Sequence, residues 1–145
     1  MIVYAESSAV LAWLLGESSE PVVRAVLESA DRVVTSSLTT LECARGLSRA
    51  RLIGRINSVQ ELATLRLLDV AESTWDVHAL TDRVVARARA KFPVEPVRTL
   101  DALHLATALT LQDAIGPLTV LSLDARVREN ALALKFAMAP PNPVT

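Results

Sequence analysis

Residues 1–10 read MIVYAESSAV and place a carboxylate between a strand and a helix. The apolar run IVYA at residues 2–5 predicts a short buried strand, and the apolar residues from Ala9 onward predict a helix. Glu6 stands where the strand ends and is followed at once by two serines. An acid at the end of a core strand calls for a reason, either structural or functional.

Predicted strands and helices alternate along the rest of the chain. Strands are expected at residues 2–5, 32–36, 65–70, 118–123 and 135–139, and helices at 9–15, 21–30, 41–53, 58–64, 75–91, 100–112 and 125–134. This alternation favours a three-layer α/β/α domain around a mostly parallel central sheet of about five strands. Residues 1–145 are a typical length for a single domain. In such folds, functional sites lie outside the carboxyl ends of the strands.

The composition narrows the class of protein. Half of the 145 residues are apolar, which is ample for a core, and the formal net charge of −1 favours no partner by bulk electrostatics. The lone cysteine, Cys43, excludes an internal disulfide and a cysteine-rich zinc site. No apolar run reaches the roughly 18–20 residues of a membrane span, so we expect a cytoplasmic protein without a membrane partner.

Four acids stand where a site is expected. Glu6 and Asp124 each follow a predicted strand, whereas Glu42 and Asp101 lie near predicted helix starts among apolar neighbours. Four carboxylates in one cleft would repel one another unless a cation neutralised them. Oxygen ligands alone suit hard cations, so the pattern is compatible with a Mg²⁺ site in which Mn²⁺ is also possible.

Each acid also has a purely structural interpretation. Glu42 follows Thr39 at capping-box spacing and could bind a free backbone N–H of its own helix. Asp124 could cap the last helix, and Asp101 could be favoured by the helix dipole. Spacing alone leaves both interpretations open for each residue.

Four segments together resemble the PIN-domain family, and specifically its VapC-type toxin ribonucleases of toxin–antitoxin pairs. They are MIVYAESSAVLAWLLGE (1–17), SSLTTLECARGLSRA (36–50), RTLDALHLATAL (98–109) and LSLDARVRENALALKFAMAP (121–140). The third is the most specific, and the order and separation of all four match the family pattern. The resemblance covers nearly the whole chain.

The resemblance implies a function and a site. Glu6, Glu42, Asp101 and Asp124 would form a catalytic acidic site, with Glu6 and Asp101 as the metal ligands. Glu42 and Asp124 would complete the pocket directly or through water. It further implies metal-assisted hydrolysis of single-stranded or loop RNA, a cognate VapB-type antitoxin as partner, and a homodimer.

Glu6 departs from the family pattern, in which the first acid is normally Asp. Its carboxylate is displaced by about one bond length, and an error near 1 Å in a catalytic group can cost about 100-fold in rate. One alternative is therefore a degenerate PIN module that binds RNA or antitoxin and cuts weakly or not at all. A second is an unrelated phosphoryl-accepting receiver domain, which the single acid after the first strand disfavours.

Two further features have alternative interpretations. Arg45 and Arg49 are four residues apart on one predicted helix face, where they could contact RNA phosphates or form a solvated surface. His104 is three residues after Asp101 and could act as a ligand or base, although a histidine packed at the rim of the core is the simpler interpretation.

Overall fold

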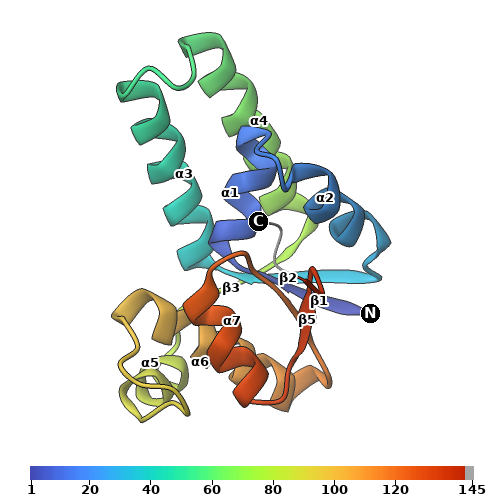
Figure 1. The fold of residues 1–145 in the computed structure, drawn as a ribbon, viewed down its shortest axis with the longest axis vertical. Coiled ribbons are helices and arrows are strands. Elements are labelled where there is room, and N and C mark those ends of the chain that lie inside the picture. Colours follow the sequence, from blue (N-terminus) through green and yellow to red (C-terminus); the bar gives the residue numbers. More distant parts are fainter. Residues whose placement is uncertain (143–145) are drawn as a thin grey trace.

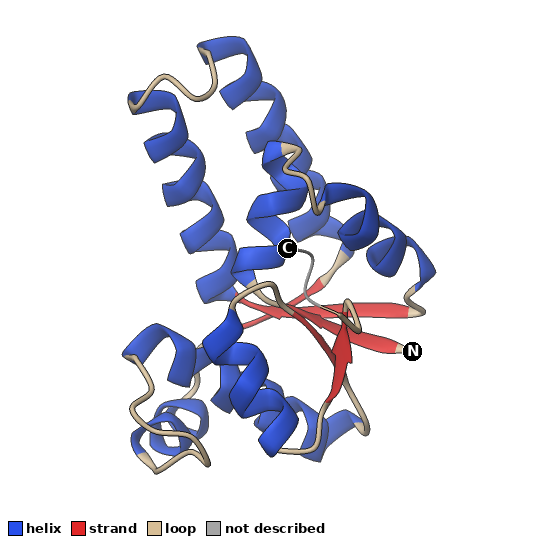
Figure 2. Cartoon of the chain, in the orientation of Figure 1, coloured by secondary structure: helices blue, strands red, loops and turns tan. Residues whose placement is uncertain are grey.

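The computed structural model describes residues 1–142, which form a five-stranded sheet with helices on both faces (Figures 1 and 2). The strands are β1 (Ile2–Ala5), β2 (Arg32–Ser36), β3 (Asp76–His78), β4 (Thr119–Leu121) and β5 (Ala137–Ala139). Their order is β3-β2-β1-β4-β5, and every neighbouring pair is parallel. The predicted α/β class with a parallel five-stranded sheet is confirmed.

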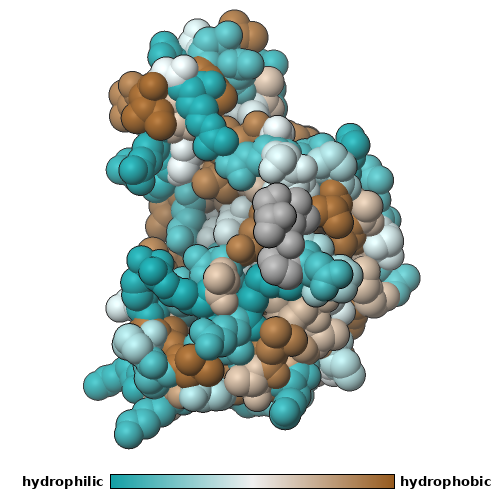
Figure 3. All heavy atoms as spheres, in the orientation of Figure 1, coloured by the Kyte–Doolittle hydropathy of each residue, from teal (hydrophilic) through white to brown (hydrophobic). Residues whose placement is uncertain are grey.

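The helices form the outer two layers. They are α1 (Ser7–Leu15), α2 (Glu20–Ser29), α3 (Ser37–Leu52), α4 (Ser58–Thr74), α5 (Asp82–Arg89), α6 (Thr99–Ile115) and α7 (Ala125–Ala133). Figure 1 shows α1 to α4 on one side of the sheet and α5 to α7 on the other. The α3–α4 hairpin projects beyond the sheet, and apolar surface gathers at its tip in Figure 3, where Leu52 and Ile53 are exposed.

The central strand, β1, is covered on both faces. Tyr4 packs into the cluster beneath α6, whereas Val3 and Ala5 pack against the α1 and α2 side. Successive side chains of a strand point to opposite faces, so a strand buried on both faces has no polar alternation. This explains why IVYA carries only apolar side chains before Glu6.

The predicted strand at residues 65–70 is wrong, because this run lies inside α4. Leu65, Leu68 and Ala71 face the neighbouring helices, whereas Leu67 and Val70 are exposed. That spacing of three and four residues is helical, and exposed leucines within the run disguise it as a continuous apolar strand.

The third strand is instead β3, at the start of the helix expected over 75–91. It pairs with β2 at the edge of the sheet, and most of it is exposed, so it lacks an apolar signal. The helix begins later, at α5, where the side chain of Thr81 accepts a hydrogen bond from the backbone N–H of Val84.

Among the described residues, none of the helices has the length and apolar character needed to cross a bilayer.

Candidate active site

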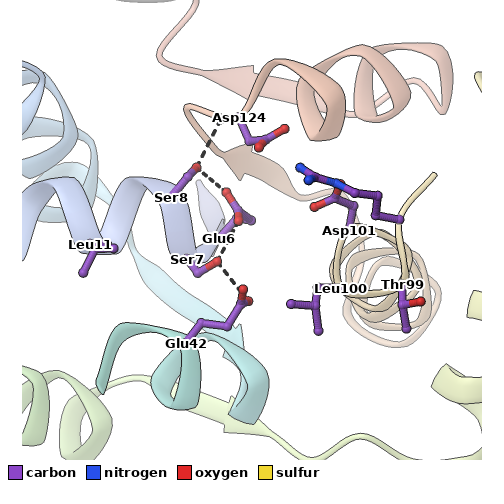
Figure 4. Close-up of a pocket in the computed structure, with 10 residues that line it drawn as sticks. Glu6, Ser7, Ser8, Leu11, Glu42, Thr99, Leu100, Asp101 and Asp124 are labelled. Carbon is purple, nitrogen blue, oxygen red and sulfur yellow. Dashed lines mark hydrogen bonds and ion pairs between the residues drawn. The ribbon is translucent and has the colours of Figure 1, made fainter. Parts of the chain in front are cut away.

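A cavity of about 450 Å³ lies at the carboxyl ends of β1 and β4 and is lined by all four predicted acids. Figure 4 shows Glu6, Ser7 and Ser8 on one wall and Thr99, Leu100 and Asp101 on the other. The parallel sheet delivers Glu6 to this edge directly after β1. The placement agrees with the rule that sites in parallel sheets lie beyond the strand ends.

Glu6 is held by three serine hydroxyls. Its Oε1 accepts a hydrogen bond from Ser7 Oγ at 2.8 Å, and its Oε2 accepts bonds from Ser122 Oγ at 2.8 Å and from Ser8 Oγ. The side chain is buried, and it caps no helix although it precedes α1. The bond from Ser122 therefore ties the end of β1 to the segment after β4.

Glu42 is fixed by a buried histidine. Glu42 Oε1 lies 2.6 Å from His104 Nε2 and 3.0 Å from Ser7 Oγ, whose single hydrogen is shared between Glu6 and Glu42. A carboxylate can only accept, so His104 Nε2 carries a hydrogen, and its Nδ1 lies 2.9 Å from the hydroxyl of Tyr4. The contacts of Nε2 with Glu42 and of Nδ1 with Tyr4 together fix the orientation of the ring.

These contacts decide two of the open interpretations. Burial disfavours the charged form of Glu42, but hydrogen bonds from His104 and Ser7 and the attraction of His104 outweigh it and lower the pKa of Glu42. The capping-box interpretation is wrong, because α3 begins at Ser37 and is capped by Ser36. His104 is fully buried and supports the site from within the core.

Close packing of α1 against α3 brings Glu42 to Ser7. Gly46 on α3 faces Leu11 on α1, and a Cβ at Gly46 would lie only 2.8 Å from a Leu11 methyl carbon. A larger residue would force the two helices apart or displace Leu11. The absence of a side chain at Gly46 therefore allows α1 and α3 to approach closely enough for Ser7 to contact Glu42.

Asp101 lies in the first turn of α6 and has fewer hydrogen-bond partners within residues 1–142 than Glu6 or Glu42. Its Oδ2 is buried and has no hydrogen-bond partner among the described residues, and the nearest cation is Arg98, whose Nε lies 3.6 Å away. Burial and the neighbouring carboxylates of Asp124 and Glu6 raise the pKa of Asp101, whereas Arg98 opposes the rise. A buried carboxylate oxygen without a partner is costly unless a ligand completes it.

Asp124 has both a structural and a pocket position. It is the N-cap of α7, and its Oδ1 accepts from the backbone N–H of Arg126 at 2.8 Å and of Val127 at 3.2 Å. The capping interpretation is thus confirmed. The same residue lines the acidic cavity, so capping does not remove it from the site.

The sequence pattern of the PIN domain family matches residues 3–133. The chain belongs to the PIN domain family. It is 33% identical over 111 residues to Ribonuclease VapC35 of Mycobacterium tuberculosis, covering 76% of this chain and 73% of that protein. It is also 33% identical over 144 residues to Ribonuclease VapC46 of the same organism, covering 97% of this chain and 98% of that protein. The resemblance to VapC-type proteins is confirmed.

Solved structures share the fold of this PIN domain. A toxin–antitoxin complex from Klebsiella pneumoniae contains a chain with a TM-score of 0.68 and 14% sequence identity. The match covers 98% of this chain and 99% of that one. At this identity, the likeness concerns the arrangement of helices and strands.

The donors of the PIN-domain pocket suit a hard cation by their chemistry. All four are carboxylates, and the unpartnered Oδ2 of Asp101 is an oxygen that a cation would complete. Within residues 1–142, however, no three Asp, Glu, His or Cys side chains lie close enough to hold one ion together. The donor set therefore suits a hard cation by its chemistry, while its present spacing allows at most two of these side chains to bind the same ion.

The two predicted arginines lie beside the acidic cavity and do not line it. Arg45 and Arg49 line an adjoining groove along α3, which also contains Glu42 and Leu100. Arg98 lines the acidic cavity itself and was absent from the sequence prediction. Its spacing of three from Asp101 was an available signal for an ion pair. The bond between His104 and Glu42 had no such signal, because 62 positions separate them.

Proposed function

We propose that this PIN domain, acting as a single domain over residues 1–145, is a metal-dependent ribonuclease and the toxin of a toxin–antitoxin pair. One observation carries the proposal: Asp101, whose buried Oδ2 has no hydrogen-bond partner among the described residues, lines a cavity together with three further acids. Identity of 33% to two proteins named ribonucleases supports the same chemistry. The substrate would be RNA, cut by hydrolysis of a phosphodiester bond.

The proposed metal ligands are Asp101 and Glu6, with Glu42 and Asp124 acting directly or through water. Mg²⁺ is the first candidate and Mn²⁺ the second. A bound divalent cation would neutralise phosphate charge and lower the pKa of a water. Glu42 is held through Oε1 by His104 and Ser7, which leaves Oε2 free of bonds to the described residues and able to orient a water.

The proposed partners are a VapB-type antitoxin and a second copy of the chain. The Klebsiella pneumoniae structure with the same fold is a toxin–antitoxin complex, which supports the first. The homodimer and the cytoplasmic location rest on the family resemblance and stay predictions.

A degenerate module that binds RNA without efficient cleavage is the second candidate. It is favoured by the position of Glu6, because both oxygens of this acid already bind serine hydroxyls within the buried wall. A metal ligand there would have to share oxygens with these hydroxyls.

The test compares RNA cleavage by the parent, Asp101→Asn and Glu6→Asp, with and without Mg²⁺. We expect Asp101→Asn to lose at least about 100-fold in rate, because a metal ligand is removed, and Glu6→Asp to keep or raise the rate. Asp113→Asn is the matched control, because Asp113 lies on the same helix and pairs with Arg83 on the surface. Equal cleavage by the parent and Asp101→Asn would contradict the nuclease assignment. An inactive parent rescued by Glu6→Asp would support the degenerate module.

A further inference from the structure

Arg98 is the only basic residue among the described residues that line the acidic cavity. It immediately precedes α6, and its side chain caps no backbone group. Arg98 lines the cavity, and about two thirds of its side chain (67%) is exposed to solvent. The side chain of Arg98 therefore does not stabilise the start of α6 by capping.

The contact between Arg98 and Asp101 is loose. Nε lies 3.6 Å from Oδ2, beyond hydrogen-bond distance, and only the Arg98 side of the pair is exposed to solvent. Yet Arg98 is the nearest positive charge to an oxygen that has no other partner. The guanidinium therefore partly neutralises Asp101 and remains free to leave it.

A cation that binds Oδ2 of Asp101 would occupy the oxygen that Arg98 faces. Two positive groups at one oxygen repel each other, so metal binding and the Arg98–Asp101 contact compete. A displaced guanidinium presents a planar fork of N–H donors. This fork matches the oxygens of a phosphate group.

We propose that Arg98 is a phosphate-binding residue for RNA that exchanges partners. It pairs with Asp101 when the acids hold no cation, and it turns to a backbone phosphate of the RNA when they do. This inference rests on the proposed function, because it assumes that both a metal ion and RNA use the cavity. Arg45 and Arg49 line the adjoining groove and are not placed to compete for Asp101.

If Arg98 exchanges partners, removing its charge should change the affinities for Mn²⁺ and for RNA in opposite directions. Arg98→Ala should bind Mn²⁺ about 3- to 10-fold more tightly, because a competing cation is lost. It should bind RNA about 10-fold more weakly, and the slope of log affinity against log salt should shrink by about 0.7. Arg98→Lys keeps the charge and should restore most of the slope.

Both affinities are measurable without cleavage. Mn²⁺ binding is followed by calorimetry in the absence of RNA, and RNA binding by the anisotropy of one fluorescein-labelled hairpin RNA with Ca²⁺ in place of Mg²⁺. Arg83→Ala is the matched control, because Arg83 is equally exposed and pairs with Asp113 outside the cavity. We expect the control to change neither affinity beyond error. Melting curves in chelator verify that all variants are folded.

Several outcomes would overturn the inference. An unchanged salt slope in Arg98→Ala would remove the phosphate contact, and weaker Mn²⁺ binding in the same variant would remove the competition. If the parent cleaves RNA and Arg98→Ala behaves like Arg83→Ala, the inference fails while the proposed function stands. If the parent neither cleaves RNA nor binds Mn²⁺, the nuclease function and the exchange fall together.

Discussion

Glu42 and Asp101 line one cavity from two different helices, and the protein treats them in opposite ways. Glu42 receives hydrogen bonds from His104 and Ser7, and its pKa is lowered. Asp101 keeps a buried oxygen that has no hydrogen-bond partner within residues 1–142, and its pKa is raised. The difference teaches that one acid is organised by the fold itself, whereas the other is left to be completed by a ligand. Four predictions test this contrast.

The largest effect should come from His104, which anchors the Glu42 side. His104→Ala removes a fully buried side chain and its hydrogen bonds with Tyr4 and Glu42, so we expect a loss of about 3 kcal/mol in unfolding free energy. Urea unfolding in chelator measures it. His78→Ala, at the edge strand, is the comparison and should cost less than about 1 kcal/mol. Equal losses would mean that the buried network adds nothing.

Neutralising the two acids should shift stability in opposite directions. Glu42→Gln loses charge-assisted hydrogen bonds and should lower the unfolding free energy by about 1 kcal/mol at neutral pH. Asp101→Asn removes a repelled charge and should raise it by a few tenths of a kcal/mol to about 1 kcal/mol. Both are measured by urea unfolding without divalent ions. A loss of stability in Asp101→Asn would show that Arg98 already satisfies this acid.

The pH dependence should separate the same two acids. The lowered pKa of Glu42 gives stability that is present above its ordinary value of 4.5 and is lost as pH falls through the folded pKa. The raised pKa of Asp101 gives a penalty that is present above the folded pKa and disappears below its ordinary value of 3.8. The effects of Glu42→Gln and Asp101→Asn should therefore both shrink between about pH 5 and pH 3. Mutant effects that stay constant with pH would exclude titration as their cause.

The smallest expected effect concerns Cys43, next to Glu42 on α3. Burial, together with the charges of Glu6, Glu42 and Glu72, raises the pKa of Cys43 to about 12. The native thiol should therefore not react measurably with iodoacetamide at pH 8, whereas the denatured chain reacts fully. Mass spectrometry of alkylated protein measures both. Rapid native labelling would mean that the α1–α3 contact opens readily.

The parts predicted from sequence are those with a local signal. The strands at 2–5 and 32–36 were predicted with the bounds that the structure has, because both are continuous apolar or β-branched runs. The part of α4 at residues 65–70 was wrongly predicted as a strand. Apolar residues such as Leu67 and Val70 lie on its exposed face, where a helix usually carries polar side chains. β3 was missed because an exposed edge strand needs few apolar side chains.

In the site, too, the features with a local sequence signal were predicted and the long-range contacts were not. The four acids line one cavity, an arrangement that the family resemblance implied and that spacing alone left open. Their supports were not predictable: the partner of Glu42 lies 62 positions away on a helix whose packing only the fold determines. The metal ligation and the catalytic roles stay predictions.

The place of β1 in the sheet has a consequence for synthesis. β1 is made first, but it lies between β2 and β4, and Glu6 needs Ser122 from the segment after β4. The pocket cannot assemble until the segment after β4 has been made, because Asp101, Ser122 and Asp124 come late in the chain. A nascent chain that has released only β1 therefore carries Glu6 without a formed cavity. If the proposed activity holds, the chain acquires its chemistry only after that segment has left the ribosome.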